Sequence, residues 1–251
     1  MRTNTDVELA GLTDLGCQRQ NNEDSFAVWE PSSKEQLRNK GRLAIVADGM
    51  GGHEGGQEAS RLAVDCIQKI YSTESGDPQT LLSSGFAAAH HCIQEYATAH
   101  PNLHGMGTTA TAAVVFPSQL YFAHVGDSRL YLVRDGSISR LTHDHSYVGR
   151  LVENGVLSSE EAEGHPQRHI LTAALGSGPD VVPDMSSNPV LLSPGDVIVL
   201  CTDGLWGVVD DHEIQRIVSS ASLSEACKKL IAMARSKGGP DNITVQLLRI
   251  G

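Results

Sequence analysis

The chain has 251 residues, of which 40% are hydrophobic and 20% charged, values typical of a soluble globular protein that one mixed α/β domain could fill. Its formal net charge of −11 argues against nucleic acid and anionic membrane surfaces as partners. No apolar run approaches the ~18 residues of a membrane span, and the polar N-terminus is unlike a signal peptide. The five cysteines are widely spaced without a C-x-x-C pair, so we expect reduced thiols in a cytoplasmic protein.

The first half of the chain alternates polar connections with strongly patterned segments. The run Leu43–Ala47 is wholly apolar, which is typical of a strand buried on both faces. After a glycine-rich turn, apolar residues recur at helical spacing over Gln57–Tyr71. The polar stretch Pro31–Lys40 is predicted to be a hairpin loop. Two further strands and a second helix are expected at Val7–Thr13, Asp24–Trp29 and Thr80–Ala99.

The second half is regular at both ends and irregular between them. From Met106 to Leu141 the composition predicts consecutive strands joined by short turns, which form an antiparallel meander. The polar segment Asp144–Asn188 contains three prolines and is predicted to leave the core as a flap, with short helices at Tyr147–Glu153 and Ser158–Glu163. The remaining elements are expected to be strand Val197–Cys201, helices Asp211–Ser219 and Leu223–Ser236, and strand Ile243–Ile250.

Aspartates stand where the predicted strands end. Two buried strands share one design, because each is followed by an aspartate and a glycine, with Asp48 in one case and Asp203 in the other. A single Asp-Gly pair would more simply be a turn. Asp127 follows a further strand, and Asp241 directly precedes the last one. Four carboxylates at strand termini could therefore meet at one edge of a sheet.

Carboxylates gathered in this way repel one another unless cations or protons lie between them. Oxygen ligands of this kind suit Mg²⁺ or Mn²⁺ better than zinc or copper. A glycine after each aspartate lets the backbone approach an ion, so that a carbonyl can add a ligand. The aspartates therefore indicate a site for hard divalent cations, although an acidic composition by itself is also explained by solubility.

Other chemistries have weaker support in the sequence. The glycine-rich stretch Gly49–Gly56 could hold a nucleotide phosphate, but it lacks the Gly-Lys-Ser/Thr ending of a P-loop. No cysteine is followed six positions later by arginine, so the loop of the cysteine phosphatases is absent. The chain also has no G-x-S-x-G and no H-E-x-x-H motif, which removes common serine and zinc hydrolases.

Six motifs occur in one order between Gly16 and Val245. They are Gly16-x-x-Arg19-x-x-Asn22-Glu23-Asp24, the segment Val46–His53, Met106–Thr109, His124–Arg129, Cys201–Trp206, and Gly238–Val245. Each is weakly specific alone, but together they resemble the bacterial PPM, or type 2C, protein phosphatases. That resemblance implies a metal-dependent hydrolase of phosphoserine and phosphothreonine in proteins. It also implies an αββα sandwich of two antiparallel β-sheets flanked by helices, as one catalytic domain over residues 1–251 with a flap near residues 144–188.

The resemblance also implies the ligands of the metal ions. Two Mn²⁺ or Mg²⁺ ions would be bound tightly, with Asp48 between them and the carbonyl of Gly49 on one of them. Asp203 and Asp241 would hold the other ion, and Asp127 would ligate a third, weaker ion. Two further acidic residues would act mainly through metal-bound water, namely Glu23 and Asp24.

Catalytic roles follow from the same resemblance. Arg19 would hold the substrate phosphate with its planar fork of donors. The two cations would neutralise the phosphate and acidify a bridging water, whose hydroxide attacks phosphorus without a phospho-enzyme. Eukaryotic relatives place a histidine directly after the Asp-Gly pair, where this chain has Met50. His53 is the nearest candidate for the acid that protonates the leaving oxygen, and a structural role fits it equally well.

The implied partners are phosphorylated proteins and a cognate Ser/Thr kinase, with the enzyme itself a free-standing monomer. The alternative is a module of the same fold that has lost catalysis and binds a phosphopeptide or a signal. Such degenerate members should lose ligand aspartates, and all four remain in this chain. We therefore expect an active phosphatase, whose substrate range could be broad or confined to one regulator.

Overall fold

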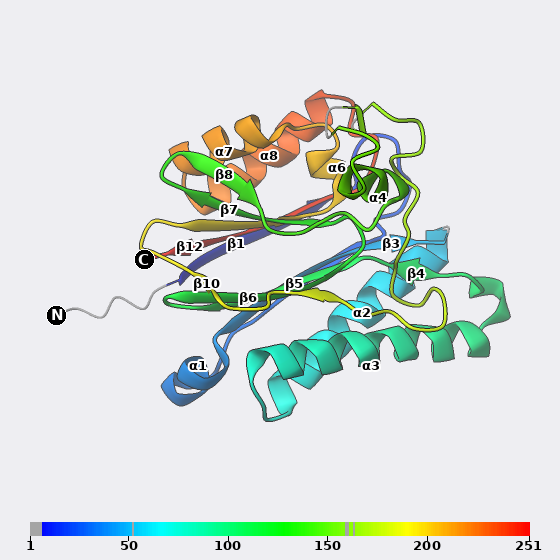
Figure 1. Ribbon diagram of the computed structural model, residues 1–251, viewed down its shortest axis with the longest axis horizontal. Helices are drawn as coiled ribbons and strands as arrows, with labels where there is room; N and C mark the ends of the chain where they lie inside the picture. Colours follow the sequence, from blue (N-terminus) through cyan, green and yellow to red (C-terminus); the bar gives the residue numbers. More distant parts are fainter. Residues whose placement is uncertain (1–6, 52, 159–160, 163) are drawn as a thin grey trace.

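The structure, a computed structural model, describes residues 7–51, 53–158, 161–162 and 164–251. Two antiparallel β-sheets face each other, and helices cover both outer faces (Figure 1). This arrangement confirms the αββα sandwich that the resemblance implies. Within the described residues, no helix combines the length and the hydrophobicity that crossing a bilayer would require.

One sheet has five strands in the order β1-β12-β11-β7-β8. All neighbouring strands are antiparallel, and β12 lies between β1 and β11. The strands from the two ends of the described chain are therefore neighbours in this sheet. Their bounds are β1 Val7–Asp14, β7 Arg129–Arg134, β8 Ser137–Arg140, β11 Val197–Cys201 and β12 Ile243–Ile250.

The second sheet has the order β10-β6-β5-β3-β2, and two short strands extend it, because β4 pairs with β3 and β9 pairs with β6. These pairs are also antiparallel. The bounds are β2 Asp24–Trp29, β3 Arg42–Met50, β4 Gly107–Thr108, β5 Ala110–Phe116, β6 Gln119–Val125, β9 Asp184–Met185 and β10 Val190–Leu191.

Long helices form the two outer layers. In Figure 1, α2 and α3 cover the second sheet, and α7 and α8 cover the five-stranded one. The helix bounds are α1 Lys34–Lys40, α2 His53–Thr73, α3 Pro78–Ala99, α4 Tyr147–Glu153, α6 Asp203–Trp206, α7 Asp211–Ser220 and α8 Leu223–Ser236, with a 3₁₀ turn, η1, at Pro101–Leu103.

Strand β3 shows how one apolar run serves two cores. Leu43, Ile45 and Ala47 pack against α2 and α3, whereas Ala44 and Val46 belong to the core between the sheets. Because successive side chains of a strand point to opposite faces, a strand covered on both sides needs apolar residues at every position. Strand β11 alternates in the same way between its own helices and the inner core. Both strands confirm the prediction from their sequences.

Helix α1 lies where the sequence predicts a hairpin loop, so that prediction is wrong. The hydroxyl of Ser33 accepts the backbone N–H of Gln36 at 3.1 Å and caps the first turn. Gly41, at φ +63°, ends the helix. None of its residues is buried, so the segment lacks the apolar stripe by which a helix is recognised in a sequence.

The strands between Met106 and Leu141 do not form one meander, because the chain changes sheet after β6. Strands β4, β5 and β6 belong to one sheet, and β7 and β8 to the other. Gly126, at the crossing point, has φ +107°, and a Cβ there would lie 2.5 Å from the side chain of Thr109. Only glycine allows this close turn. Asp127 therefore lies where the chain passes between the sheets.

Two elements near the glycine-rich stretch are longer than predicted. Strand β3 continues to Met50, since Gly49 pairs with Thr108 of β4. Asp48 therefore lies within the strand and not beyond its end. Helix α2 begins at His53, four residues earlier than predicted, so the glycines at positions 55 and 56 belong to its first turns.

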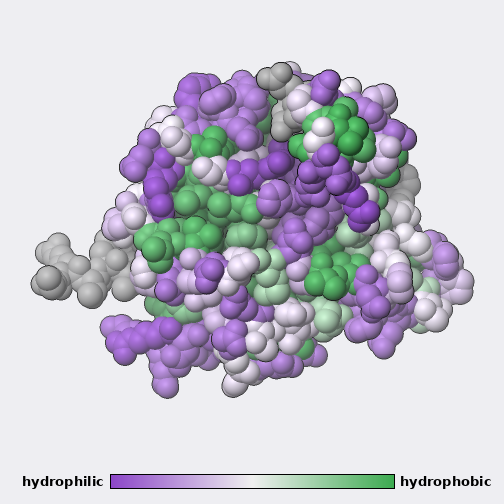
Figure 2. Space-filling model, viewed as in Figure 1, coloured by the Kyte–Doolittle hydropathy of each residue, from purple (hydrophilic) through white to green (hydrophobic). Residues whose placement is uncertain are grey.

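The segment between β8 and β9 leaves the sheets as expected, but it returns to the core at Leu175, which is fully buried in the cluster under α2 and α3. Helix α4 has the predicted bounds. Of the helix predicted at Ser158–Glu163, residues 161–162 are helical, while 159–160 and 163 lie outside the described residues. The excursion ends earlier than Asn188, because β9 already pairs with β6. Most of the exposed large hydrophobic side chains belong to this segment and to β10. Figure 2, viewed as Figure 1, shows green hydrophobic surface among hydrophilic residues.

Candidate metal centre

Strands β2 and β3 place two carboxylates side by side, because Asp24 lies opposite Asp48 in their register. The Oδ2 atom of Asp24 accepts hydrogen bonds from the hydroxyls of Thr202 at 2.8 Å and Thr244 at 2.6 Å. Thr244 belongs to β12 of the opposite sheet, and Thr202 directly follows β11 of the same sheet. The Oδ1 atom of Asp24 is buried and has no hydrogen-bond partner among the described residues. This carboxylate therefore links the two sheets and leaves one oxygen unpaired.

The five-stranded sheet contributes Asp203 and Asp241. Asp203 is the first residue of α6 and follows β11 after a single threonine. A Cβ on Gly204 would clash with the carbonyl oxygen of Asn242. The turn that carries Asp203 and the turn that carries Asp241 are thus in backbone contact, which requires glycine at position 204.

Arg19 lies at the rim of this group. Its Nη2 atom donates to Oδ2 of Asp241 at 2.6 Å, and its side chain is 48% exposed. The hydrogen bond with Asp241, together with the negative charges of Asp241, Glu23 and Asp48, raises the pKa of Arg19 above its usual value. The guanidinium therefore lies close to carboxylates from both sheets.

Glu23 packs against two glycines. Its carbonyl oxygen accepts the N–H of Gly49 at 3.1 Å, and its own N–H donates to Oδ1 of Asn242 at 2.8 Å. A Cβ on Gly56 would clash with the Glu23 carboxylate, and a Cβ on Gly49 would clash with the carbonyl of Gly56. The glycine-rich stretch thus brings β3, the start of α2 and this carboxylate into contact.

The neighbouring aspartates lie close enough to Asp48 to affect its ionisation. Burial raises the pKa of Asp48 well above its usual value, and the charges of Asp24, Asp203, Asp127 and Asp241 raise it further. Burial also raises the pKa of Asp24, to about 7, although two hydroxyls lower it. A group of desolvated like charges is unfavourable unless a proton or a cation neutralises it. The structure thus brings all four sequence-predicted aspartates together.

The donor set of this group fits a pair of hard divalent cations. Carboxylate oxygens from both sheets meet beside the Gly49 backbone, and hard cations prefer oxygen ligands. The Oδ1 atoms of Asp24 and Asp203 are buried without a hydrogen-bond partner in the described part of the chain. No three His, Cys, Asp or Glu side chains among the described residues already form a ligand group. Since Asp241 binds Arg19, its carboxylate would have to turn toward a cation.

A family model described as protein phosphatase 2C matches residues 18–247. The chain belongs to the protein phosphatase 2C family. PstP, a serine/threonine protein phosphatase of Mycobacterium tuberculosis, is 36% identical over 240 residues, which are 95% of this chain and 44% of PstP. The serine/threonine phosphatase stp of Listeria monocytogenes is 38% identical over 242 residues, 94% of this chain and 93% of stp. The chain thus spans less than half of PstP but most of stp.

A solved structure supports the same assignment. The catalytic domain of PstP in complex with two manganese ions is 34% identical, has a TM-score of 0.83, and is matched over 97% of both chains. The protein phosphatase 2C family is metal-dependent, and membership makes this chain a serine/threonine protein phosphatase by class. The fold expected from the resemblance is confirmed by this match.

The remaining predicted residues differ in how far the structure describes them. Asp127 is buried at the crossing between the sheets, and burial together with the charge of Asp203 raises its pKa well above the usual value. His53 begins α2, but its side chain lies outside the described residues, so its role as an acid stays a prediction.

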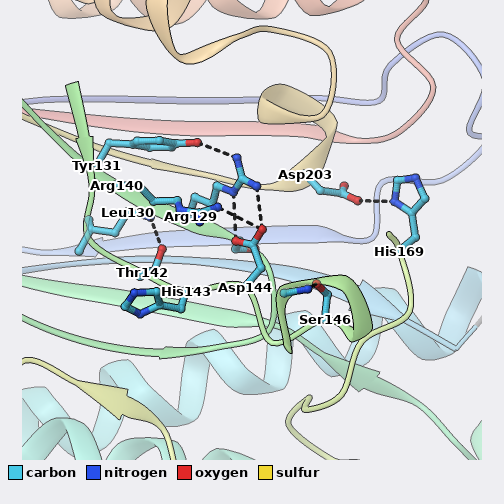
Figure 3. A network of polar contacts seen from close by, with 12 residues as sticks. Arg129, Leu130, Tyr131, Arg140, Thr142, His143, Asp144, Ser146, His169 and Asp203 are labelled. Carbon is cyan, nitrogen blue, oxygen red and sulfur yellow. Dashed lines mark hydrogen bonds and ion pairs between the residues drawn. The ribbon is translucent and has the colours of Figure 1, made fainter. Parts of the chain in front are cut away.

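Sequence reasoning missed several polar residues of this phosphatase site. Thr202 and Asn242 each directly adjoin a predicted ligand, and that adjacency is a signal that could have found them. Thr244 carries no such signal. His169, from the flap, places its Nδ1 atom 3.8 Å from Oδ2 of Asp203 (Figure 3). That contact joins residues far apart in the sequence.

The pKa of Asp24 leads to a prediction about the metal-free phosphatase. Its carboxyl titrates near 3.8 when unfolded and at about 7 when folded, so the folded state binds the proton more tightly. The stability contributed by the protonated group is complete below pH 3.8 and is lost as pH rises through about 7. In EDTA, we expect the Tm to fall over this interval. Asp24→Asn should flatten the fall, and an unchanged slope in that variant would contradict the assignment to Asp24.

Proposed function

We propose that residues 1–251 form one catalytic domain that hydrolyses phosphoserine and phosphothreonine in phosphorylated proteins, using two tightly bound Mn²⁺ or Mg²⁺ ions. The observation that carries this proposal is the group of four aspartates from both sheets at the end of the sandwich where β3 and β11 end. Burial and the charges of the neighbouring aspartates raise the pKa of Asp48 in this group well above its usual value. Membership in a metal-dependent family supports it.

In this proposal the ions would neutralise the substrate phosphate and acidify an attacking water. Asp48 would lie between the two tightly bound ions, with the Gly49 carbonyl on one and Asp203 and Asp241 on the other. Asp127 would hold a third, weaker ion. The more indirect ligands would be two acidic residues that contact water, Glu23 and Asp24.

Side chains of the protein would position the groups that take part in the reaction. Thr202 and Thr244 fix the carboxylate of Asp24. Because the Arg19 side chain is half exposed at the rim, its guanidinium can donate to the oxygens of an arriving phosphate. His53, at the start of α2, is proposed to protonate the leaving oxygen.

The partners in this proposal are phosphorylated proteins, with a Ser/Thr kinase as the opposing enzyme and the phosphatase acting as a monomer. The net charge of −11 supports a protein over a nucleic-acid substrate. Exposed Tyr147 and Ile170 lie side by side in the flap, joined by a backbone hydrogen bond of 2.8 Å. In this proposal their apolar side chains contact the substrate residues that flank the phosphorylated serine or threonine.

Arg19→Ala should separate binding from chemistry in this function. The variant loses charge-assisted contacts with the phosphate, so the KM for a phosphothreonine peptide should rise by about 10- to 150-fold. The kcat should hold if those contacts form equally in the ground and transition states. Steady-state kinetics with Mn²⁺ present would measure both constants.

Arg61→Ala is the matched control, since this arginine is also half exposed and paired with acids, but on the outer helix α2. Its KM should equal that of the wild type. An unchanged KM in Arg19→Ala would remove Arg19 from the phosphate site. A wild-type protein that binds phosphopeptides but never hydrolyses them would favour the binding-module alternative.

A further inference from the structure

Arg129, two residues beyond Asp127, is enclosed by partners from three parts of the chain. Figure 3 shows two of these partners, Tyr131 and Asp144. Its Nε and Nη2 atoms donate to the two carboxylate oxygens of Asp144 at 3.0 and 2.7 Å. Its Nη1 atom donates to the hydroxyl of Tyr131 at 3.2 Å. The guanidinium carbon lies 3.5 Å from the centre of the Trp206 ring. The side chains of Arg129 and Asp144 are only 14% and 13% exposed, so this pair is largely removed from water.

The flap root, defined as residues 143–146, holds the Asp127 turn from both sides. Before the aspartate, the N–H of His145 donates to the carbonyl of Gly126 at 2.7 Å, and the N–H of Gly126 donates to Nδ1 of His145 at 3.2 Å. After the aspartate, the carboxylate of Asp144 holds Arg129. The turn that carries Asp127 and the flap root therefore form one hydrogen-bonded unit.

Trp206 extends this unit to a second proposed ligand. It is the last residue of α6, whose first residue is Asp203. Because the Trp206 ring stacks on the guanidinium, the position of this short helix depends on the position of Arg129. Arg129 thus contacts the helix that begins at Asp203 and itself lies two residues after Asp127.

Arg129 also follows Asp127 closely in the chain, since it is the first residue of β7 and lies two positions after the aspartate. A guanidinium whose donors were not already occupied would compete with a metal ion for so near a carboxylate.

We propose that Asp144 is a positioning residue of the phosphatase site: it occupies the guanidinium fork of Arg129, so that Asp127 stays available to a cation and the Asp127 turn and α6 keep their arrangement. This inference rests on the function proposed above. It makes the flap root part of the metal centre, although Asp144 itself touches neither metal nor substrate. Mutation of a residue that holds a metal ligand in place typically lowers metal affinity or activity by about 10- to 100-fold.

The same strand provides a matched control. At the far end of β7, Arg134 donates from Nε and Nη2 to the two carboxylate oxygens of Asp196 at 2.9 and 2.6 Å. Asp196 is 3% exposed. The two ion pairs thus share one geometry and one strand, but only the pair at Asp144 adjoins the aspartates. Asp196→Asn therefore measures the structural cost of losing a buried carboxylate partner.

The experiment compares Mn²⁺ titrations by calorimetry, thermal unfolding and phosphopeptide kinetics for the wild type, Asp144→Asn, Asp196→Asn and Asp127→Ala. The Mn²⁺ site that Asp127→Ala removes should bind about 10- to 100-fold more weakly in Asp144→Asn. The same variant should need more Mn²⁺ for half-maximal kcat, while its KM for peptide at saturating Mn²⁺ holds. Asp196→Asn should lower the Tm and leave the titration as in the wild type.

A double variant, Asp144→Asn with Arg129→Gln, separates positioning from loss of structure. Removing the competing guanidinium should restore Mn²⁺ binding toward the wild-type value, whereas a purely structural role predicts a further loss.

Should Asp144→Asn fail to fold, Asp144→Glu replaces it in each measurement. This variant keeps the negative charge but changes where the carboxylate meets the Arg129 guanidinium. If Asp144→Asn and Asp144→Glu bound Mn²⁺ as the wild type does, the inference would be overturned. It would also be overturned if the wild type had no Mn²⁺ site that Asp127→Ala removes. A wild type without phosphatase activity would overturn the proposed function itself.

Discussion

Removal of divalent cations is expected to abolish phosphopeptide hydrolysis, and Mn²⁺ or Mg²⁺ is expected to restore it. Without cations, the phosphate would meet Asp48 and its neighbouring carboxylates, which repel a second anionic group. The loss should reach about a thousandfold or more, since metal ions contribute several kcal/mol of charge stabilisation in such reactions. Phosphate release from a phosphothreonine peptide after EDTA treatment and desalting, with metal content measured in parallel, provides the test.

Ca²⁺ serves as a comparison ion in the same assay. It should restore much less activity, because its longer and more flexible coordination acidifies water less than Mn²⁺ does. Circular dichroism before and after EDTA shows whether the fold persists. Full turnover by protein whose metal has been measured as absent would refute the mechanism.

Asp48→Asn should have two effects of opposite direction. The kcat should fall by about a thousandfold or more, because this carboxylate is proposed to lie between both cations. The metal-free Tm should rise, because the substitution removes a desolvated charge that four other aspartates repel. Kinetics with Mn²⁺ and thermal unfolding in EDTA measure the two effects separately.

Asp196→Asn provides the contrast for this variant. Its carboxylate is buried at the other end of β11 and is paired with Arg134, which helps to lower its pKa. The metal-free Tm should therefore fall in this variant, and kcat should hold. If Asp48→Asn retained wild-type turnover with an unchanged metal content, Asp48 would not be a ligand.

The fold was most predictable where burial leaves a pattern in the sequence. Strand β11 and helix α8 have the predicted bounds, since an unbroken apolar run and a helical apolar stripe can each be recognised locally. Helix α1 buries no residue and leaves no such pattern. The passage from β6 to β7 was equally hidden, because two consecutive strands with a short turn have the same local sequence whether or not they share a sheet.

The site was predictable to a similar extent. The aspartates were found because each stands beside a recognisable strand, and the structure brings Asp48, Asp127, Asp203 and Asp241 close together. Their supporting contacts were not found. The pairing of Arg129 with Asp144 depends on how the chain leaves β8 and returns, which no local pattern records.

The strand order of the five-stranded sheet also affects how fast this chain can fold. Strands β11 and β12 form an adjacent pair that lies between β1 and β7, both of which precede them in the sequence. Strand β1 therefore cannot pair with β12, its neighbour in that sheet, until residues more than two hundred positions later in the sequence are in place. Contacts of such sequence separation carry a large loop-closure entropy and slow the folding of β-rich domains. Folding kinetics of this phosphatase should accordingly be limited by closure of the sheet around β12.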